Sequence, residues 1–395
     1  MSRKQMVALF LCNFVPWAFG SGVLPLLPLY AVELGAGETV AGTYLALVYL
    51  AMTVGSMGAG WVATLFHSRK IPLIAAGVTC VPLIWLMGQG PLIWGLTLLT
   101  ALTWFCGGLG LALIGILAGL SAAPEERGRT FGLLTAAGGL GTLTGGLASG
   151  YLVDQSGFTA LFTTFAAFIA IWPITGLFLA DAEVVVTRNT SRSQGRRQSL
   201  GRDYVLYVTS ALLNSITGFA FILIRSLLMN SQAFSAIAIS TVAAIGSVVQ
   251  LPLPTLFGWL SDRTGRKRYV ALSRFTGILG LAALLAASRG WHFYTASVLG
   301  AIGGAAAIAV GSAWVTDLVP RESLDRGMAI ATAAGNGGAV LGFAWAGFAL
   351  QRWGVGATVG IAIAVTVISW LLLVPIRVQS RAGEFANQPE TLIMG

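Results

Sequence analysis

The 395-residue chain has very little charge. Only 9% of its residues are charged and 56% are hydrophobic, whereas roughly 25% of the residues in a soluble protein are charged. Such a chain cannot cover a water-facing surface, so the composition excludes a row of soluble domains. The three cysteines lie in different apolar stretches without CxxC or other metal-binding spacing, which favours small buried side chains over metal ligands. They are Cys12, Cys80 and Cys106.

The sequence also lacks the marks of an enzyme. We find no spacing typical of a nucleophile with its base, no metal-ligand cluster and no nucleotide-binding loop. Glycine is abundant, with 51 residues, but its dense rows follow no strand and precede no Lys-Ser/Thr pair, so they are not phosphate loops. Rows such as 138–146 and 335–338 suit helices that approach closely and slide. We therefore expect a non-enzymatic protein with no cofactor and no metal.

Twelve long apolar runs fill most of the chain. A helix needs about 20 apolar residues to cross a bilayer, and each run is near or above that length. The runs predict an all-α membrane protein with twelve transmembrane helices. They cover residues 6–32, 39–66, 71–89, 92–122, 130–153, 158–180, 204–229, 234–260, 269–288, 293–318, 327–350 and 355–376.

Sequence features recur at about half the chain length. The stretch Gly60–Lys70 resembles Gly258–Arg268, which begins 198 residues later, and Leu152–Gly157 resembles Ala349–Gly354. A chain built twice from one apolar unit is typical of a transporter with two parallel halves. The repeat predicts two pseudo-symmetric six-helix halves at 1–180 and 204–377, a polar cytoplasmic linker at 181–203 and a flexible cytoplasmic tail at 378–395.

Basic residues gather on one side of the predicted membrane. When every second loop is collected, one set holds 20 of the 23 Lys and Arg residues, including Arg263 to Arg274, and the other holds Arg225, Arg289 and Arg352. By the positive-inside rule, we expect both termini in the cytoplasm. We further expect an inner-membrane protein. The net charge of +9 is explained by basic residues in short cytoplasmic loops, which set the orientation and contact anionic lipid. We therefore expect no nucleic-acid partner.

One repeated stretch carries a family signature. Gly258-Trp-Leu-Ser-Asp-Arg-Thr-Gly-Arg-Lys-Arg268 resembles the cytoplasmic signature of the major facilitator superfamily after helix 8. Val23-Leu-Pro-Leu-Leu-Pro-Leu-Tyr30 resembles the helix 1 ending of its twelve-helix drug and sugar efflux branch, and Gly138-Gly-Leu-Gly-Thr-Leu-Thr-Gly-Gly146 resembles the helix 5 antiporter motif of that branch. The resemblance implies the twelve-helix fold over the whole chain and an exporter that works by antiport.

Three positions depart from the efflux pattern. Thr64 stands where the first cytoplasmic signature has its acid, and Thr142 stands where the helix 5 motif has a proline. Thr103 or Trp104 stands where the helix 4 motif has an arginine. These departures weaken the inference that this chain, like the efflux branch, works by proton antiport. They leave membership in the superfamily intact.

Acidic residues and histidine are absent from the middles of all twelve runs. Proton relays in membranes use these residue types inside the bilayer. Coupling through a carboxylate at the end of a run, Glu33 or Asp154, therefore stays open. Facilitated diffusion and coupling through the substrate's own charge are the alternatives.

The complete signature also predicts a latch between the halves. Asp262 lies at a helix end, and a carboxylate there can accept hydrogen bonds from the N-terminus of a neighbouring helix, whose dipole favours negative charge. The resemblance places this loop against the start of helix 5, so we expect the latch in the outward-open state. The alternative is a solvated turn that only helps to set the topology. The expected latch residues are Asp262, Arg263, Arg266, Lys267, Arg127 and Arg129.

Arg225 is the strongest single candidate for substrate binding. It lies in the outer part of the seventh run, and a charge inside a span costs about 3 kcal/mol and usually faces a cavity or a partner. The resemblance puts helices 1, 4, 7 and 10 around the cavity, where Arg225 could bind an anionic or polar group. Alternatively, it snorkels to the outer interface or pairs with Glu33, Glu38 or Asp154.

Polar and aromatic residues in the middles of the runs complete the candidate cavity. Asn214 and Thr217 precede Phe221 and Arg225 at steps of three and four, so all four share one helix face. Pockets combine aromatic walls with a few placed polar groups, whereas the same residue types also pack, anchor or tie helices. The further candidates are Trp17, Ser21, Tyr49, Trp104, Gln250 and Asn336.

These features predict a monomeric secondary transporter that moves a small organic solute by alternating access, with export as the expected direction. Its expected partners are the solute, the bilayer and, if a carboxylate couples transport, protons. One alternative is uptake or facilitated transport of an anionic or polar metabolite, with Arg225 as the anchor. Another is a lipid or lysolipid translocator, or a sensor on the same scaffold. A lipid role predicts a lateral apolar opening, whereas a solute role predicts a closed, partly polar cavity.

Overall fold

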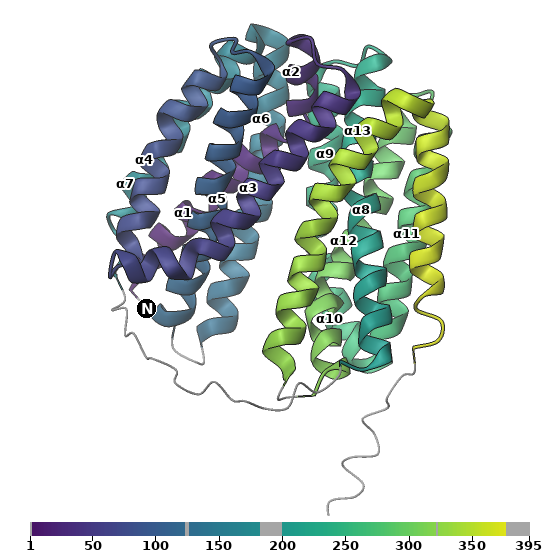
Figure 1. Cartoon of the computed structure of the whole chain (residues 1–395). Helices are drawn as coiled ribbons and strands as arrows, with labels where there is room; N and C mark the ends of the chain where they lie inside the picture. The colour runs from purple at the N-terminus through teal and green to yellow at the C-terminus, as the bar shows by residue number, and fades with distance from the viewer. Residues whose placement is uncertain (1, 123–125, 182–199, 321–322, 377–395) are drawn as a thin grey trace, which may run out of the picture.

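The computed structural model describes residues 2–122, 126–181, 200–320 and 323–376. Helix is the only regular secondary structure in these ranges, and Figure 1 shows the helices gathered into two bundles, α1 to α7 and α8 to α13. The helices are α1 (Arg3–Val23), α2 (Leu27–Glu33), α3 (Glu38–Leu65), α4 (Lys70–Met87), α5 (Ile93–Ser121), α6 (Arg127–Ile169), α7 (Ile171–Gly176), α8 (Arg202–Ser231), α9 (Ala236–Gln250), α10 (Leu253–Thr264), α11 (Arg266–Leu285), α12 (Gly290–Leu318) and α13 (Leu324–Leu371).

Helices α6 and α13 are each a hairpin of two arms. They contain 43 and 48 residues, which correspond to about 65 and about 72 Å, more than twice a bilayer core of about 30 Å. Each is interrupted by one glycine with a positive φ, 74° at Gly157 and 75° at Gly354, in a conformation essentially restricted to glycine. Figure 1 shows the second arm of α13, in yellow, running back along the second bundle.

The two hairpins reconcile the helices with the predicted number of spans. Within the described ranges, nine helices are long and apolar enough to cross a bilayer, and α9 with α10, bent by 40°, makes a tenth. Counting each arm of α6 and α13 separately gives the twelve predicted spans. All-helical architecture is what a lipid environment requires, because a helix satisfies its backbone hydrogen bonds within one segment.

Two of the runs predicted as continuous helices are broken at a proline. The run 6–32 divides into α1 and α2 around Pro25, and the run 234–260 divides into α9 and α10 around Pro252. Proline lacks a backbone N–H, so the hydrogen-bond ladder of the helix is interrupted there, although Leu24 and Leu251 before the two prolines keep helical backbone angles. Hydropathy alone does not register these breaks, because the surrounding residues remain apolar.

The two bundles repeat each other in detail. Lys70 Nζ donates a hydrogen bond to the Leu177 carbonyl at 2.6 Å, and Lys267 Nζ donates one to the Val374 carbonyl at 2.8 Å. Donors and acceptors are each 197 residues apart, and the glycine breaks in α6 and α13 share that offset. These matching hydrogen bonds and glycine breaks confirm two pseudo-symmetric halves. The predicted linker 181–203 and tail 378–395 fall mostly outside the described residues, so their bounds stay predictions.

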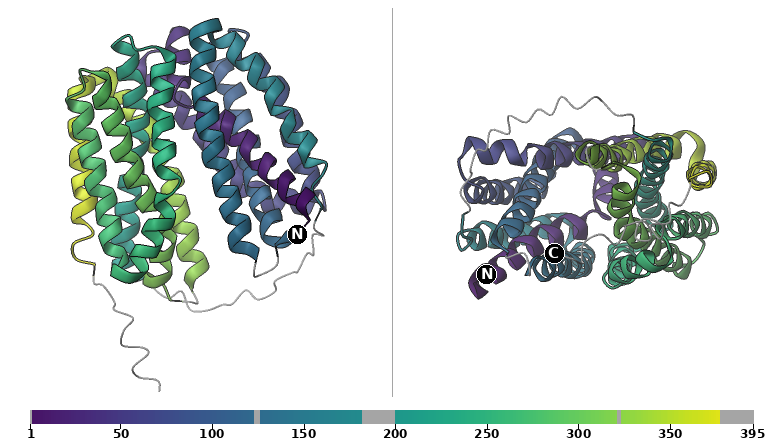
Figure 2. Two further views of the ribbon diagram at one scale, coloured as in Figure 1. Left: turned by 180° about the vertical axis from the view of Figure 1, so that it is seen from behind. Right: turned by 90° about the horizontal axis from the view of Figure 1, so that it is seen from below.

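The bundles meet at one end of the molecule. Figures 1 and 2 show them in contact near α2 and separating toward the end where α1 begins. At the meeting end α3 packs closely on α13, and glycine at position 42 makes this approach possible. A Cβ added to Gly42 would lie only 2.5 Å from the Phe343 carbonyl oxygen. We call this the closed end. The opposite end, the basic end, is where five helices begin with a basic residue: Arg3, Lys70, Arg127, Arg202 and Arg266.

Candidate functional site

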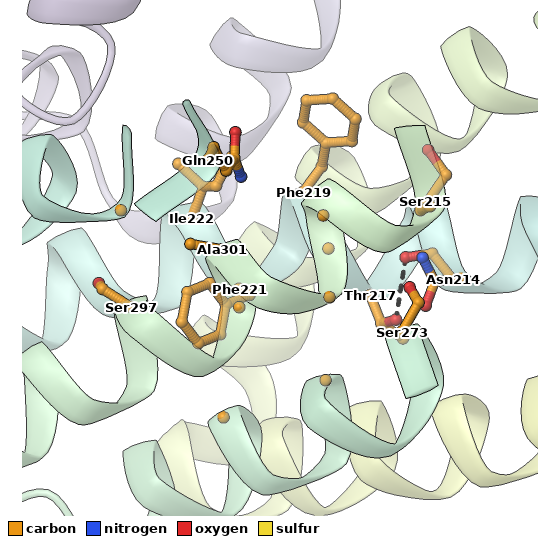
Figure 3. Close-up of a pocket in the computed structure, with 18 of the residues that line it drawn as sticks. Asn214, Ser215, Thr217, Phe219, Phe221, Ile222, Gln250, Ser273, Ser297 and Ala301 are labelled. Atoms are coloured by element: carbon orange, nitrogen blue, oxygen red, sulfur yellow. Dashed lines mark hydrogen bonds between the residues drawn. The ribbon is translucent and has the colours of Figure 1, made fainter. Parts of the chain in front are cut away.

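A cavity of about 620 Å³ lies against the second bundle. Helices α8, α9, α11 and α12 form most of its wall, and α1 and α6 of the first bundle add a few residues, among them Ser21 and Thr142. Most of the wall is glycine, alanine and larger apolar residues, and about a third of the lining residues are polar. Small-molecule sites combine apolar walls with placed polar groups in this way. Figure 3 shows Asn214 and Ser273 on one side and Ser297 on the other.

Six of the ten predicted cavity residues line this wall. Four share one face of α8, as their steps of three and four predict, and Thr217 Oγ1 donates to the Asn214 carbonyl at 3.2 Å (Figure 3). The other two come from α1 and α9. The six are Ser21, Asn214, Thr217, Phe221, Arg225 and Gln250.

The other four predicted cavity residues are not part of this wall. Trp104 is buried in the first bundle with its ring 5.5 Å from that of Phe19. Tyr49 joins the interface between the bundles, with its ring 5.1 Å from both Phe219 and Phe343. Aromatic side chains bury large apolar areas, so packing takes them out of the cavity. Trp17 is 38% exposed on α1, and Asn336 is half-buried on α13 beside the lining residue Gly335.

Arg225 is buried in the cavity wall without a carboxylate. It is 6% exposed, so it does not snorkel to the surface. Its Nη1 donates to Ser297 Oγ at 2.7 Å, and its Cζ lies 5.6 Å from the centre of the Phe221 ring. Its Nε has no hydrogen-bond partner. No acid within the described ranges pairs with it, so its positive charge is left for the cavity.

Sequence reasoning missed a second buried arginine in the same wall. Arg274 counts among the basic-loop residues in the topology argument, but it lies inside α11 and is 2% exposed. Its guanidinium donates to three serine hydroxyls, from Ser210, Ser273 and Ser369. The signal was present, because an arginine inside an apolar run is a functional candidate wherever it occurs.

Two helix N-termini are capped across the closed end. The carboxylate of Asp154 on α6 accepts hydrogen bonds from the backbone N–H groups of Ala236 and Ile237, which begin α9, at 2.8 and 2.9 Å. At the pseudo-symmetric position, Gln351 Oε1 on α13 accepts from the Thr39 N–H at the start of α3 at 3.1 Å. Side-chain oxygens satisfy otherwise unpaired N–H groups at helix starts. Both caps join one bundle to the other.

Asp154→Ala is expected to loosen the closed end. Loss of a capping side chain costs about 0.5–2 kcal/mol, and a carboxylate also interacts favourably with the helix dipole. The fraction of molecules with this end separated should rise about 2- to 30-fold. Distances between spin labels placed near the ends of α6 and α9 would measure it.

Gln351→Ala is the matched control for Asp154→Ala. It removes the neutral cap at the related position, which carries no charge toward the dipole of α3, so its effect should be smaller. Equal distance distributions for wild type and Asp154→Ala would show that the Asp154 cap does not hold the closed end.

The residues of the predicted basic-end latch lie elsewhere in this conformation. Asp262 is exposed and pairs with Arg266 at 3.4 Å, and Arg266 Nε pairs with Asp317 at 2.6 Å. Arg263 lies over the Trp259 ring at 3.9 Å. All these contacts stay within the second bundle. Lys267 donates hydrogen bonds to the carbonyls of Val374 and Ile376, just beyond the end of α13. Arg129 is exposed on α6, and the side chain of Arg127 is outside the described residues. The latch, expected in the opposite conformation, stays a prediction.

Glu33 and Asp154, the two carboxylates singled out for coupling, lie near the closed end and outside the cavity wall. Glu33 ends α2 and is exposed. Asp154 caps α9. The cavity wall itself contains no Asp, Glu or His among the described residues.

The comparison with known families decides the identity of the fold. The family model of the Major Facilitator Superfamily matches residues 9–223 and 204–392. The chain belongs to this superfamily. Membership confirms the predicted class of function: this superfamily member is a multi-pass membrane protein and a secondary transporter of small molecules, not an enzyme.

Individual members of the superfamily resemble the chain over most of its length. The multidrug resistance protein MdtG of Klebsiella pneumoniae (strain 342) is 27% identical over 293 residues, which cover 70% of each chain. Among solved structures, the nucleoside transporter NupG superposes with a TM-score of 0.74 at 17% identity, covering 94% of this chain and 98% of that one. A POT family transporter in complex with 5-aminolevulinic acid gives 0.76 at 12% identity, covering 93% and 95%. The two structures support the fold.

Proposed function

We propose that this superfamily member exports a small organic anion by alternating access, with Arg225 as the anchor of the anionic group. The observation that carries the proposal is the buried guanidinium of Arg225, which has an unpartnered Nε and no carboxylate within the described residues. Hydrogen bonds to charged groups contribute about 1.5–3 kcal/mol, and an arginine fork suits carboxylate or phosphate oxygens. The multidrug resistance name of a relative supports export.

The proposed orientation places the basic end and both termini in the cytoplasm. The concentration of Lys and Arg on that side supports it through the positive-inside rule. The bundles are joined at the closed end, so this conformation would then receive substrate from the cytoplasm, as an exporter requires. We propose the inner membrane as the location and a monomer as the working unit.

The proposed coupling uses the charge of the substrate. The described part of the cavity wall has arginine but no acid or histidine, which supports this choice, because a proton relay needs a group that titrates. Proton antiport stays open through the end-placed carboxylates Glu33 and Asp154. Transport by protein reconstituted in vesicles, measured with an imposed pH gradient and then with an imposed potential, would separate the two modes.

Arg225→Ala is expected to remove at least about half of the stabilisation by organic anions. The purified protein would be heated with a panel of organic anions, neutral sugars, lipophilic cations and lysolipids. A ligand at a hundred times its Kd raises the free energy of unfolding by about 2.7 kcal/mol. Anions should give this shift in wild type, and it should fall to about 1.4 kcal/mol or less in the variant, because their affinity falls about 10- to 150-fold.

Arg352→Ala is the matched control, since Arg352 is an exposed arginine on α13 outside the cavity wall. It should keep the anion shift. Arg225→Lys keeps the charge but loses the fork, so it should keep part of the shift. Equal stabilisation of wild type and Arg225→Ala by lipophilic cations, with no anion effect, would sink the anion proposal and favour drug export. A shift with lysolipids alone would favour a lipid translocator.

A further inference from the structure

Arg274 has the surroundings of a second anion-binding position. Its Nε lies 3.2 Å from Ser369 Oγ, its Nη2 lies 3.3 Å from Ser210 Oγ, and its Nη1 lies 3.3 Å from Ser273 Oγ. These serines come from α13, α8 and α11 and are themselves buried. The guanidinium is therefore held from three sides, and its residue is part of the wall of the large cavity.

The three serines orient the guanidinium of Arg274 but do not neutralise its charge. Ser210 Oγ donates to the Ser369 carbonyl, and Ser369 Oγ donates to the Ser210 carbonyl, both at 2.8 Å. The hydroxyl protons are thereby turned away, and the oxygens are free to accept from Arg274. A hydroxyl carries no net charge, so the positive charge of Arg274 remains inside the span. Such a charge is costly and marks a functional position.

The two arginines lie far apart along one cavity. Ser210, which contacts Arg274, and Arg225 are both on α8 and 15 residues apart, so their levels differ by about 22 Å. The guanidinium of Arg225 lies over Phe221, one turn back, so the two charges differ in level along α8 by about 17 Å. In Figure 3, Ser297, which contacts Arg225, and Ser273, which contacts Arg274, lie on opposite sides of Phe221.

We propose that the cavity binds one elongated organic dianion, with one anionic group at Arg225 and the other at Arg274. The inference rests on the proposed anion export and names the substrate class. The wall between the two arginines includes Phe221 and a row of glycines on α11 and α12, from Gly277 to Gly304. It offers apolar contact and room, but no further charge. The matching ligand has an apolar middle with a carboxylate or phosphate at each end.

The test uses unbranched dicarboxylates of increasing chain length and monocarboxylates of the same lengths, with the purified full-length protein. Affinity would be measured from thermal stabilisation of wild type, Arg274→Gln, Arg274→Lys and the exposed-site control Arg352→Gln. In wild type, dicarboxylates long enough to span both arginines should bind at least about tenfold tighter than the monocarboxylates of equal length, because each adds a second charge-assisted contact.

Arg274→Gln should remove this preference, while monocarboxylates should still stabilise the variant through Arg225. Arg352→Gln should change neither. If Arg274→Gln does not fold, Arg274→Lys must still show the preference, because it retains the charge. Equal affinity for the two series in wild type, at every length, would overturn the dianion inference while leaving anion export standing. A preference that survives in Arg274→Gln would make Arg274 a structural tie between helices. If neither series binds wild type, the proposed function itself fails.

Discussion

Gly347→Leu is expected to force the closed end apart. A Cβ at Gly347, on α13, would overlap the carbonyl oxygen of Glu38 at the start of α3, and it would lie 2.8 Å from the Gly42 Cα. Both are backbone atoms and cannot rotate away as a side chain can. The added side chain therefore fits only if α3 and α13 separate, which is the movement that alternating access requires at this end.

The expected shift is large. Overpacking a well-packed contact costs typically 1–3 kcal/mol, so the fraction of molecules with the closed end separated should rise about 5- to 150-fold. Spin labels on α3 and α13 near this end would report longer distances, and labels near the starts of α4 and α11 would report shorter ones. Transport should fall, because the protein would seldom return to the conformation described here.

Gly356→Leu is the matched control for this prediction. Gly356 also belongs to α13, just beyond the break at Gly354, but a Cβ there would meet nothing within 4 Å. The same substitution should therefore leave the label distances as they are in wild type. Unchanged distances in Gly347→Leu as well would mean that the α3–α13 contact does not hold the closed end, and the caps by Asp154 and Gln351 would have to do so alone.

The sequence predicts the architecture well because lipid leaves few alternatives. Each span must satisfy its own backbone groups, so long apolar runs become helices, and a repeated run becomes a repeated helix. The α8 row from Asn214 to Arg225 was predictable for a similar reason, since helix periodicity fixes which residues share a face. The two caps were not predictable, because they depend on which helix ends meet in one conformation.

Single aromatic residues were the weak point of the sequence reading. Tyr49 and Trp104 have the residue type and depth expected of cavity walls, yet Tyr49 packs between the bundles and Trp104 packs inside one. Their surroundings come from helices distant in sequence, so no local pattern separates the two roles. Arg274 shows the opposite error. Its place inside the predicted run 269–288 marked it as buried, but the topology argument grouped it with loop charges.

Gly218→Trp is expected to abolish transport without unfolding the protein. Gly218 lies on α8 in the cavity wall, between Thr217 and Phe219, and a Cβ there would meet nothing within 4 Å. The new side chain can therefore leave the helix without its Cβ meeting other atoms, and its indole would occupy the space between the two arginines. Tryptophan also favours a helix slightly more than glycine does, because its helix propensity lies between those of glycine and alanine.

Two measurements on the purified protein would check this prediction. The melting temperature of Gly218→Trp without ligand should match or slightly exceed that of wild type, whereas stabilisation by anions and transport into vesicles should fall to background. Gly360→Trp is the matched control, since Gly360 is an exposed glycine on the second arm of α13, with open space around its Cβ and no place in the cavity wall. It should transport normally. Transport that persists in Gly218→Trp would mean that the substrate does not pass through this cavity, and the roles proposed for Arg225 and Arg274 would fall together.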